Sequence, residues 1–159
     1  MDSTVEIFLD RANNELLAAD SLKKLSEDKK AKKEFALPEN TTFYSSVISH
    51  SYYAIFYAAK AVLLAKGVKT YSPEIHKRTY EAFETVLVRT GLLDVKLLEI
   101  YRKMMVRADC LLAIFKEEKG KRGNFTYNTI PQANKDPAED SLNNAKKFVA
   151  NISKVSRAL

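Results

Sequence analysis

The stretch that decides the fold is Ser45–Gly67, which reads SSVISHSYYAIFYAAKAVLLAKG. Small, aliphatic and aromatic side chains occupy nearly every side of it, as in a helix buried within a helical bundle. We predict that this helix begins near Thr41 or Thr42 and ends at Gly67, because a glycine commonly follows the last turn of a helix. Three tyrosines and one histidine, His50, interrupt its apolar surface. Two interpretations follow: a buried spine of the bundle, or a helix that also carries an aromatic site.

Capping signals divide the rest of the chain into further amphipathic helices. The predicted starts are the capping box from Ser3 to Glu6, Ser72 followed by Pro73, Asp94, and Asp136 followed by Pro137. The Lys-rich segment up to Pro38 is predicted to be a helix end and a linker. No convincing strand pattern and no internal repeat occurs. We therefore predict an all-α fold, an antiparallel up-and-down bundle of four to five helices. It forms one domain over residues 1–159, with an inserted polar and basic loop at 119–136.

Composition fits a globular domain with a sizeable core. The chain has 159 residues, 46% of them hydrophobic and 29% charged, and a single cysteine, Cys110. Its N-terminus lacks the apolar region of a signal peptide, and no apolar run approaches the ~18 residues of a membrane span. We expect a cytoplasmic protein without a membrane segment. The net charge of +6 suits a polyanionic partner, while the same lysines also suit solvated helix ends.

Residues for metal or cofactor binding are scarce. Two histidines and one cysteine do not form an ordinary zinc site, and Glu-x-x-His pairs for a di-iron bundle are missing. Four scattered glycines make no phosphate-binding loop. Cys110 stands beside two leucines and is interpreted as a small buried hydrophobic residue rather than a nucleophile. We predict no metal and no cofactor.

Metal-independent acid–base chemistry is the remaining catalytic option. A histidine takes a 2′-hydroxyl proton at neutral pH, and an arginine stabilises charge on a phosphate. We predict His50 as general base, Arg107 for the phosphate charge and Asp109 to orient a neighbouring group. Ser46 precedes Ser49 and His50 by three and four residues, and Tyr53 follows them by four and three, so these side chains share one stripe of the helix. The alternative is a hydrogen-bonded core network without activity.

Five segments occur in the order seen in one family. They are SYYAIFYAAKAVLLAKG, SPEIHKRTYEAF, RTGLLD, RADC and AEDSLNNAKKFVANI, and they span most of the chain. In these motifs the sequence resembles the HEPN domain family, in particular its small stand-alone archaeal and bacterial members. The resemblance implies an antiparallel helical bundle that forms a homodimer, with functional polar residues in the two-fold cleft. It also implies a toxin–antitoxin pairing with a minimal nucleotidyltransferase, and metal-independent RNase activity in active members.

The sequence departs from this family at the catalytic motif. Active relatives carry Arg-x(4–6)-His, and no histidine follows Arg102 or Arg107 at that spacing. Met105 takes an arginine position of the subgroup, whereas His76 matches a histidine common in it. The resemblance therefore implies binding of RNA or nucleotides, or docking of a protein partner as a non-catalytic homodimeric module, and leaves RNase activity open. The residues predicted to bind nucleic acid are Ser49, Tyr53, His76, Lys121, Arg122 and Tyr127.

The last three of these residues lie in the loop at 119–136. Basic residues alternate there with Phe125 and Tyr127, a pattern that suits phosphate binding and base stacking. A loop whose aromatic side chains fold back onto the bundle is the alternative.

Overall fold

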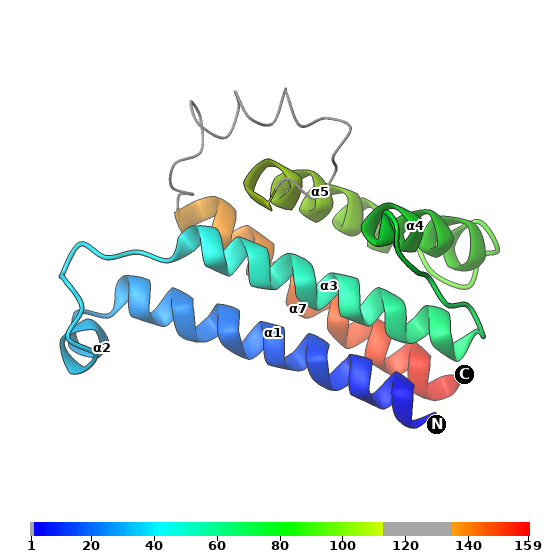
Figure 1. Ribbon diagram of the computed structural model, residues 1–159, viewed down its shortest axis with the longest axis horizontal. Coiled ribbons are helices and arrows are strands. Elements are labelled where there is room, and N and C mark those ends of the chain that lie inside the picture. The colour runs from blue at the N-terminus through cyan, green and yellow to red at the C-terminus, as the bar shows by residue number, and fades with distance from the viewer. Residues whose placement is uncertain (1, 113–134) are drawn as a thin grey trace.

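The fold is a bundle of helices (Figure 1). The computed structural model describes residues 2–112 and 135–159, and no strand occurs in these two ranges. The elements are α1 (Ser3–Glu27), α2 (Lys29–Glu34), α3 (Tyr44–Ala65), α4 (Ile75–Ala82), the π-helical η1 (Phe83–Val88), α5 (Val95–Leu112) and α7 (Lys135–Ala158). Successive long helices α1 and α3 run antiparallel, and both termini lie at the same end of the bundle. The predicted all-α antiparallel bundle is confirmed.

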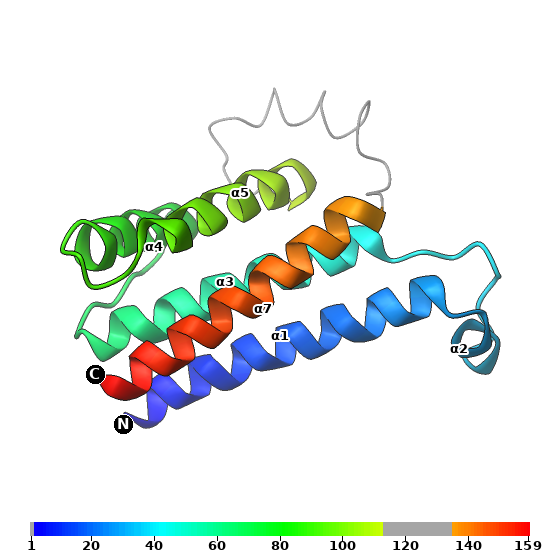
Figure 2. The same cartoon turned by 180° about the vertical axis from the view of Figure 1, so that it is seen from behind.

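Helix α3 forms the centre of the bundle. It packs against α1, α4, α5 and α7, and Figure 2, which shows the bundle from the back, has α7 crossing in front of it between α1 and α5. The core residues predicted on this helix are fully buried, and each of them is 0% exposed: Ile55, Ala58, Ala59 and Val62. Phe83, Tyr101 and Phe148 come from three other elements and stack around them with ring centroids 5.3–5.8 Å apart. A helix that is apolar on nearly every side is stable here because its neighbours in the bundle cover most of it.

Helix boundaries agree with the sequence at some ends and differ at others. Gly67 follows α3 with φ +78°, which confirms the predicted glycine, and the Asp94 carboxylate accepts a 2.8 Å hydrogen bond from Lys96 N at the start of α5. At the first helix the predicted Ser3 cap is wrong. Asp2 is the N-cap and accepts from Thr4 N at 2.7 Å. A carboxylate one residue earlier in the chain reaches the same free N–H groups.

Two proline-containing starts also differ from the prediction. Helix α4 begins at Ile75, after Glu74 in the left-handed region at φ +56°, so Ser72 does not cap it. Asp136 lies inside α7, which is already helical at Lys135. The rest of the predicted 119–136 loop lies outside the described residues.

The Lys-rich segment is more ordered than predicted. It contains the short helix α2, whose N-cap Asp28 accepts from Lys30 N at 2.9 Å and from Ala31 N at 3.2 Å. Lys32 is buried and donates from Nζ to the Glu39 carbonyl at 2.7 Å. A buried ammonium needs such a partner. The segment therefore folds back on itself and does not serve only as a linker.

Helix α3 is the candidate membrane span among the described residues. Its 22 residues include an 18-residue window with a mean hydropathy of 1.2, so the prediction that no stretch approaches spanning length is wrong. The same window is 67% buried inside the bundle. That burial is consistent with the core helix of a soluble protein.

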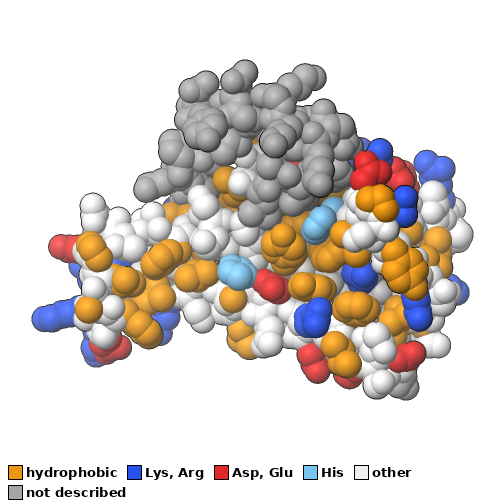
Figure 3. All heavy atoms as spheres, viewed as in Figure 1, with side chains coloured by type: hydrophobic (Ala, Val, Ile, Leu, Met, Phe, Trp, Pro, Cys, Tyr) orange, Lys and Arg blue, Asp and Glu red, His pale blue; other side chains and the backbone are white. Residues whose placement is uncertain are grey.

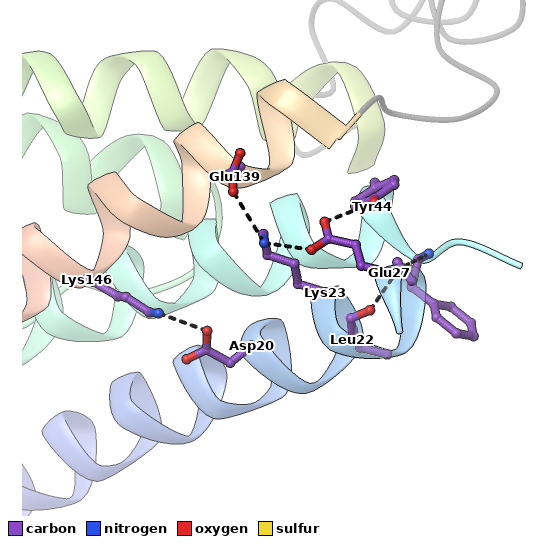
Figure 4. A network of polar contacts seen from close by, with 9 residues as sticks. Asp20, Leu22, Lys23, Glu27, Tyr44, Glu139 and Lys146 are labelled. Carbon is purple, nitrogen blue, oxygen red and sulfur yellow. Dashed lines mark hydrogen bonds and ion pairs between the residues drawn. The ribbon is translucent and has the colours of Figure 1, made fainter. Parts of the chain in front are cut away.

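A set of paired charges joins α1, α3 and α7, as Figure 4 shows. Lys23 Nζ lies 2.9 Å from Glu27 and 3.4 Å from Glu139, and the Tyr44 hydroxyl donates to Glu27 at 3.0 Å. One turn away, Lys146 pairs with Asp20 at 2.8 Å. We call these residues the α1–α7 charge network. The network links α1 to α7 through partly exposed polar side chains outside the hydrophobic core.

Candidate functional site

Two stripes of side chains face each other across the antiparallel pair α1 and α3. Positions separated by three and four residues lie on one side of a helix, so each stripe is continuous. Contacts between the two stripes extend from Glu15, in the middle of α1, to Phe8, near its N-terminus. We call these residues the α1–α3 face: Thr4, Phe8, Arg11 and Glu15 from α1, and His50, Tyr53, Tyr57 and Lys60 from α3.

The imidazole of His50 contacts the Glu15 carboxylate at one end of this face. Its Nδ1 lies 2.5 Å from the Glu15 carboxylate, and the two side chains are 36% and 24% exposed. Within the described residues, His50 Nε2 has no hydrogen-bond partner in the protein. A carboxylate that holds one ring nitrogen fixes the orientation of the imidazole and leaves the other nitrogen for a proton transfer. A general base held by a positioning residue would need such an arrangement.

Cations and aromatic rings alternate along the rest of the face. The Arg11 guanidinium lies 5.6 Å from the centre of the Tyr57 ring, which stacks on Phe8 at 6.4 Å. Lys60 Nζ lies 5.3 Å from the Phe8 ring and 5.8 Å from the Phe56 ring. In the part of the chain that the structure describes, neither cation pairs with a carboxylate within 4 Å. Figure 3 shows this side of the molecule, with histidine, basic and hydrophobic side chains close together.

His76 joins the same aromatic cluster from α4. The Tyr52 hydroxyl and His76 Nδ1 share a hydrogen bond of 2.7 Å, and the Phe56 and Tyr53 rings lie 4.5 and 5.9 Å from the imidazole. Burial, with a smaller effect of the nearby Lys60 charge, lowers the pKa of His76. Burial also raises the pKa of the Tyr52 hydroxyl. The hydrogen bond between these two side chains ties α4 to α3, close to Tyr53.

Arg107 lies in a different environment from His50. Its Nη1 donates to the Pro137 carbonyl at 3.0 Å, to Asp140 at 3.1 Å and to Ser141 Oγ at 2.7 Å. Lys103 pairs with the same Asp140 at 2.7 Å. Hydrogen bonds from Lys103 and then from Arg107 lower the pKa of Asp140. Among the described residues no hydrogen bond or ion pair joins Arg107 to His50, so one chain by itself does not bring these two predicted groups together.

The other predicted site residues lie in several places. Asp109 is 8% exposed on α5, and its charge adds slightly to the effect of burial in raising the pKa of Tyr52. Ser49 Oγ donates to the Ser45 carbonyl of its own helix at 3.1 Å. Cys110 is half-buried, where the sequence predicted a buried position. Lys121, Arg122 and Tyr127 lie outside the described residues.

Three members of the face were missed by the sequence analysis. Glu15, Arg11 and Lys60 were not singled out, because each is a charged residue on a helix flank, where charge usually only faces solvent. A signal did exist. Phe8, Arg11 and Glu15 recur at helical spacing beside the apolar stripe of α1, which predicts a common side of the helix.

The donor set for a metal is sparse in the described residues. Within 2–112 and 135–159 no group of three or more His, Cys, Asp or Glu side chains is arranged to hold a metal ion.

The fold and the α1–α3 face together define the class of protein. It is an all-α bundle with a histidine–carboxylate contact beside aromatic rings and cations that have no carboxylate partner among the described residues. A family model described as HEPN domain matches residues 5–155. The chain therefore belongs to the HEPN domain family.

One curated protein is similar to part of this chain. A protein of Methanocaldococcus jannaschii named "Putative toxin MJ0142" is 37% identical over 81 residues. The matched region is 49% of this chain and 52% of the relative, so the chain spans about half the length of that relative. What that protein does as a whole is therefore not transferred to this chain.

Proposed function

We propose that this chain is a toxin-like, RNase-related HEPN protein that binds RNA along the α1–α3 face. The observation that carries the proposal is the contact between His50 and Glu15 beside unpaired Arg11. The word toxin in the name of the relative supports it. The proposal includes a nucleotidyltransferase partner as antitoxin, a homodimer and a cytoplasmic location.

Each part of the face has a chemical task in this proposal. Nε2 of His50 accepts the proton of a ribose 2′-hydroxyl, whose oxygen then attacks the adjacent phosphorus. The bond from phosphorus to the 5′-oxygen of the next nucleotide breaks, and that oxygen leaves with a proton taken from water. Glu15 positions the imidazole and stabilises the imidazolium that forms. Arg11 offsets phosphate charge, and the partly exposed ring of Tyr53 stacks on a base. The mechanism uses no metal.

Arg107 and Asp109 keep their predicted roles only with a rearrangement. Arg107 contacts a phosphate after it leaves Asp140 and Ser141, which costs the hydrogen bonds described above. Asp109 is buried on α5, and its predicted role is to orient a group beside His50. The catalytic roles of both residues therefore stay predictions.

The test is RNA cleavage in the presence of EDTA by the wild type and two variants. His50→Ala and Glu15→Gln are each expected to lower the rate by about 10²-fold or more, because a positioned general base contributes about that much. Asn14→Ala is the matched control, since this exposed residue adjoins Glu15 on α1 and is expected to cleave like the wild type. Cleavage that persists in His50→Ala would remove the assignment.

A non-catalytic module is the second candidate. The engagement of Arg107 by three groups around the start of α7, together with the missing Arg-x(4–6)-His spacing, favours it. In this function the homodimer docks a protein partner. Co-purification with a nucleotidyltransferase, with no RNA cleaved by the free or the bound protein, is the result expected for it.

A further inference from the structure

A cavity lies at the far end of the α1–α3 face from His50. Its volume is about 390 Å³, and it is bounded by the start of α1, the last turns of α3 and residues 68–72. Ten residues of helix separate Lys60 from His50, which is about 15 Å. The cavity is therefore a separate site from the histidine–carboxylate pair. Its wall includes Phe8, Lys60, Leu64, Val68, Lys69 and Tyr71.

Cationic groups line this cavity and carboxylates do not. Lys60 and Lys69 both contribute to the wall, and none of the described residues that line it is Asp or Glu. Lys60 Nζ makes one long hydrogen bond, 3.4 Å, to the Thr70 carbonyl, and otherwise lies over the Phe8 and Phe56 rings. Burial, and then the charge of Arg11, lowers the pKa of Lys60. A half-buried ammonium without a counter-ion is costly, and a bound anion removes that cost.

The apolar part of the wall limits which anion fits. Phe8, Leu64 and Val68 offer ring and aliphatic surface beside the two ammonium groups. Volumes of about 300–1,000 Å³ with apolar walls and a few polar groups are typical of small-molecule sites. An inorganic ion would leave that apolar surface in water. A molecule with a flat or branched apolar body and one charged end would cover both parts.

We propose that this cavity binds a small organic anion, a carboxylate, sulfonate or phosphate group on an apolar body. The charged group pairs with Lys60 and Lys69, and the body packs against Phe8, Leu64 and Val68. The proposal does not depend on RNA binding or cleavage, because it uses the end of the face away from His50.

The test uses two fluorescent probes with the same rings. 8-Anilinonaphthalene-1-sulfonate carries a negative charge, and N-phenyl-1-naphthylamine lacks the sulfonate. Both are titrated into the full chain under conditions where its unfolding is cooperative, because partly unfolded proteins also bind the first probe. The wild type is expected to bind the sulfonate more tightly than the uncharged probe.

Three variants separate the charge from the cavity. Lys60→Met keeps most of the side-chain volume and is expected to weaken sulfonate binding about tenfold, with little effect on the uncharged probe. Lys66→Met is the matched control, since this exposed lysine at the end of α3 does not line the cavity. Thr4→Trp fills the cavity from the exposed start of α1 and is expected to abolish binding of both probes.

Two outcomes would overturn the proposal. Equal loss of sulfonate affinity in Lys60→Met and Lys66→Met would indicate general attraction to a basic protein. Unchanged binding of both probes in a folded Thr4→Trp variant would place them elsewhere on the surface.

Discussion

The α1–α7 charge network and the α1–α3 face use charged residues in opposite ways. In the network each cation has a carboxylate: Lys23 contacts Glu27 and Glu139, and Lys146 contacts Asp20. On the face, Arg11 and Lys60 lie over aromatic rings and pair with no carboxylate among the described residues. Both regions include α1, so one helix supports both arrangements on different sides.

This difference indicates where a ligand binds. A paired charge has already exchanged water for a protein partner, and a phosphate must displace that partner. An unpaired cation over a ring stays available, and aromatic surface beside it adds stacking. Arg107 belongs with the paired charges, although the sequence predicted it to lie in the catalytic site with His50. Its contacts with Asp140 and Ser141 give it a structural task.

The largest expected effect comes from breaking a paired charge. Arg107→Ala removes three hydrogen bonds between α5 and α7 and leaves Asp140 without one of its cations. We expect the free energy of unfolding to fall by about 1–3 kcal/mol. Urea unfolding measures it, with Lys96→Ala, an exposed change on the same helix, as the control. A loss no greater than that of the control would mean that Arg107 is available for a ligand.

A smaller effect is expected from the unpaired charge. Arg11→Glu is expected to weaken binding of single-stranded RNA about three- to tenfold at low salt and to reduce the dependence of affinity on salt. Lys147→Glu makes the same change in net charge on an exposed position of α7 and is the matched control. Fluorescence anisotropy at several salt concentrations gives both quantities. If the two variants bind RNA equally, the α1–α3 face has no special role.

The pH dependence of stability tests the environment of His76, which packs beside the α1–α3 face. Burial lowers the pKa of His76 below its usual 6.5. As the pH falls, the unfolded chain therefore binds a proton at this residue before the folded chain does. This contribution to stability is present above about pH 6.5 and is lost as the pH falls through the lowered pKa. His76→Gln removes the titration, so its stability relative to wild type is expected to improve from about pH 7.5 to about pH 5. Urea unfolding across this range checks the sign, and a constant difference would contradict it.

The smallest effect is expected in the network. Lys146 and Asp20 are 46% and 47% exposed, so Lys146→Met is expected to cost at most about 0.5 kcal/mol at low salt and nothing measurable at high salt. Thermal unfolding at two salt concentrations measures it. A larger loss that persists at high salt would mean that this network carries more of the stability than its exposure indicates.

The amount of structure predictable from sequence differs between the fold and the site. Hydrophobic spacing identified α3 as the core helix, and Ile55 and Val62 are fully buried there. Helix starts were harder to predict, because Asp2 and Ser3 are both good N-caps and the choice depends on one residue of register. The partner of His50 was missed, since Glu15 is 35 residues away and only packing brings it close.

By itself, the sequence determined the helical class, the identity of the core helix and the family. The spacing of apolar residues and the glycines that end helices are local signals, so the sequence alone shows them. Only the tertiary structure decided which charged groups are paired. Electrostatic contacts act over a few ångströms, so they depend on how the helices pack. The antiparallel packing of α1 on α3 places the Glu15 carboxylate against His50. The packing of α5 on α7 pairs Arg107 with Asp140.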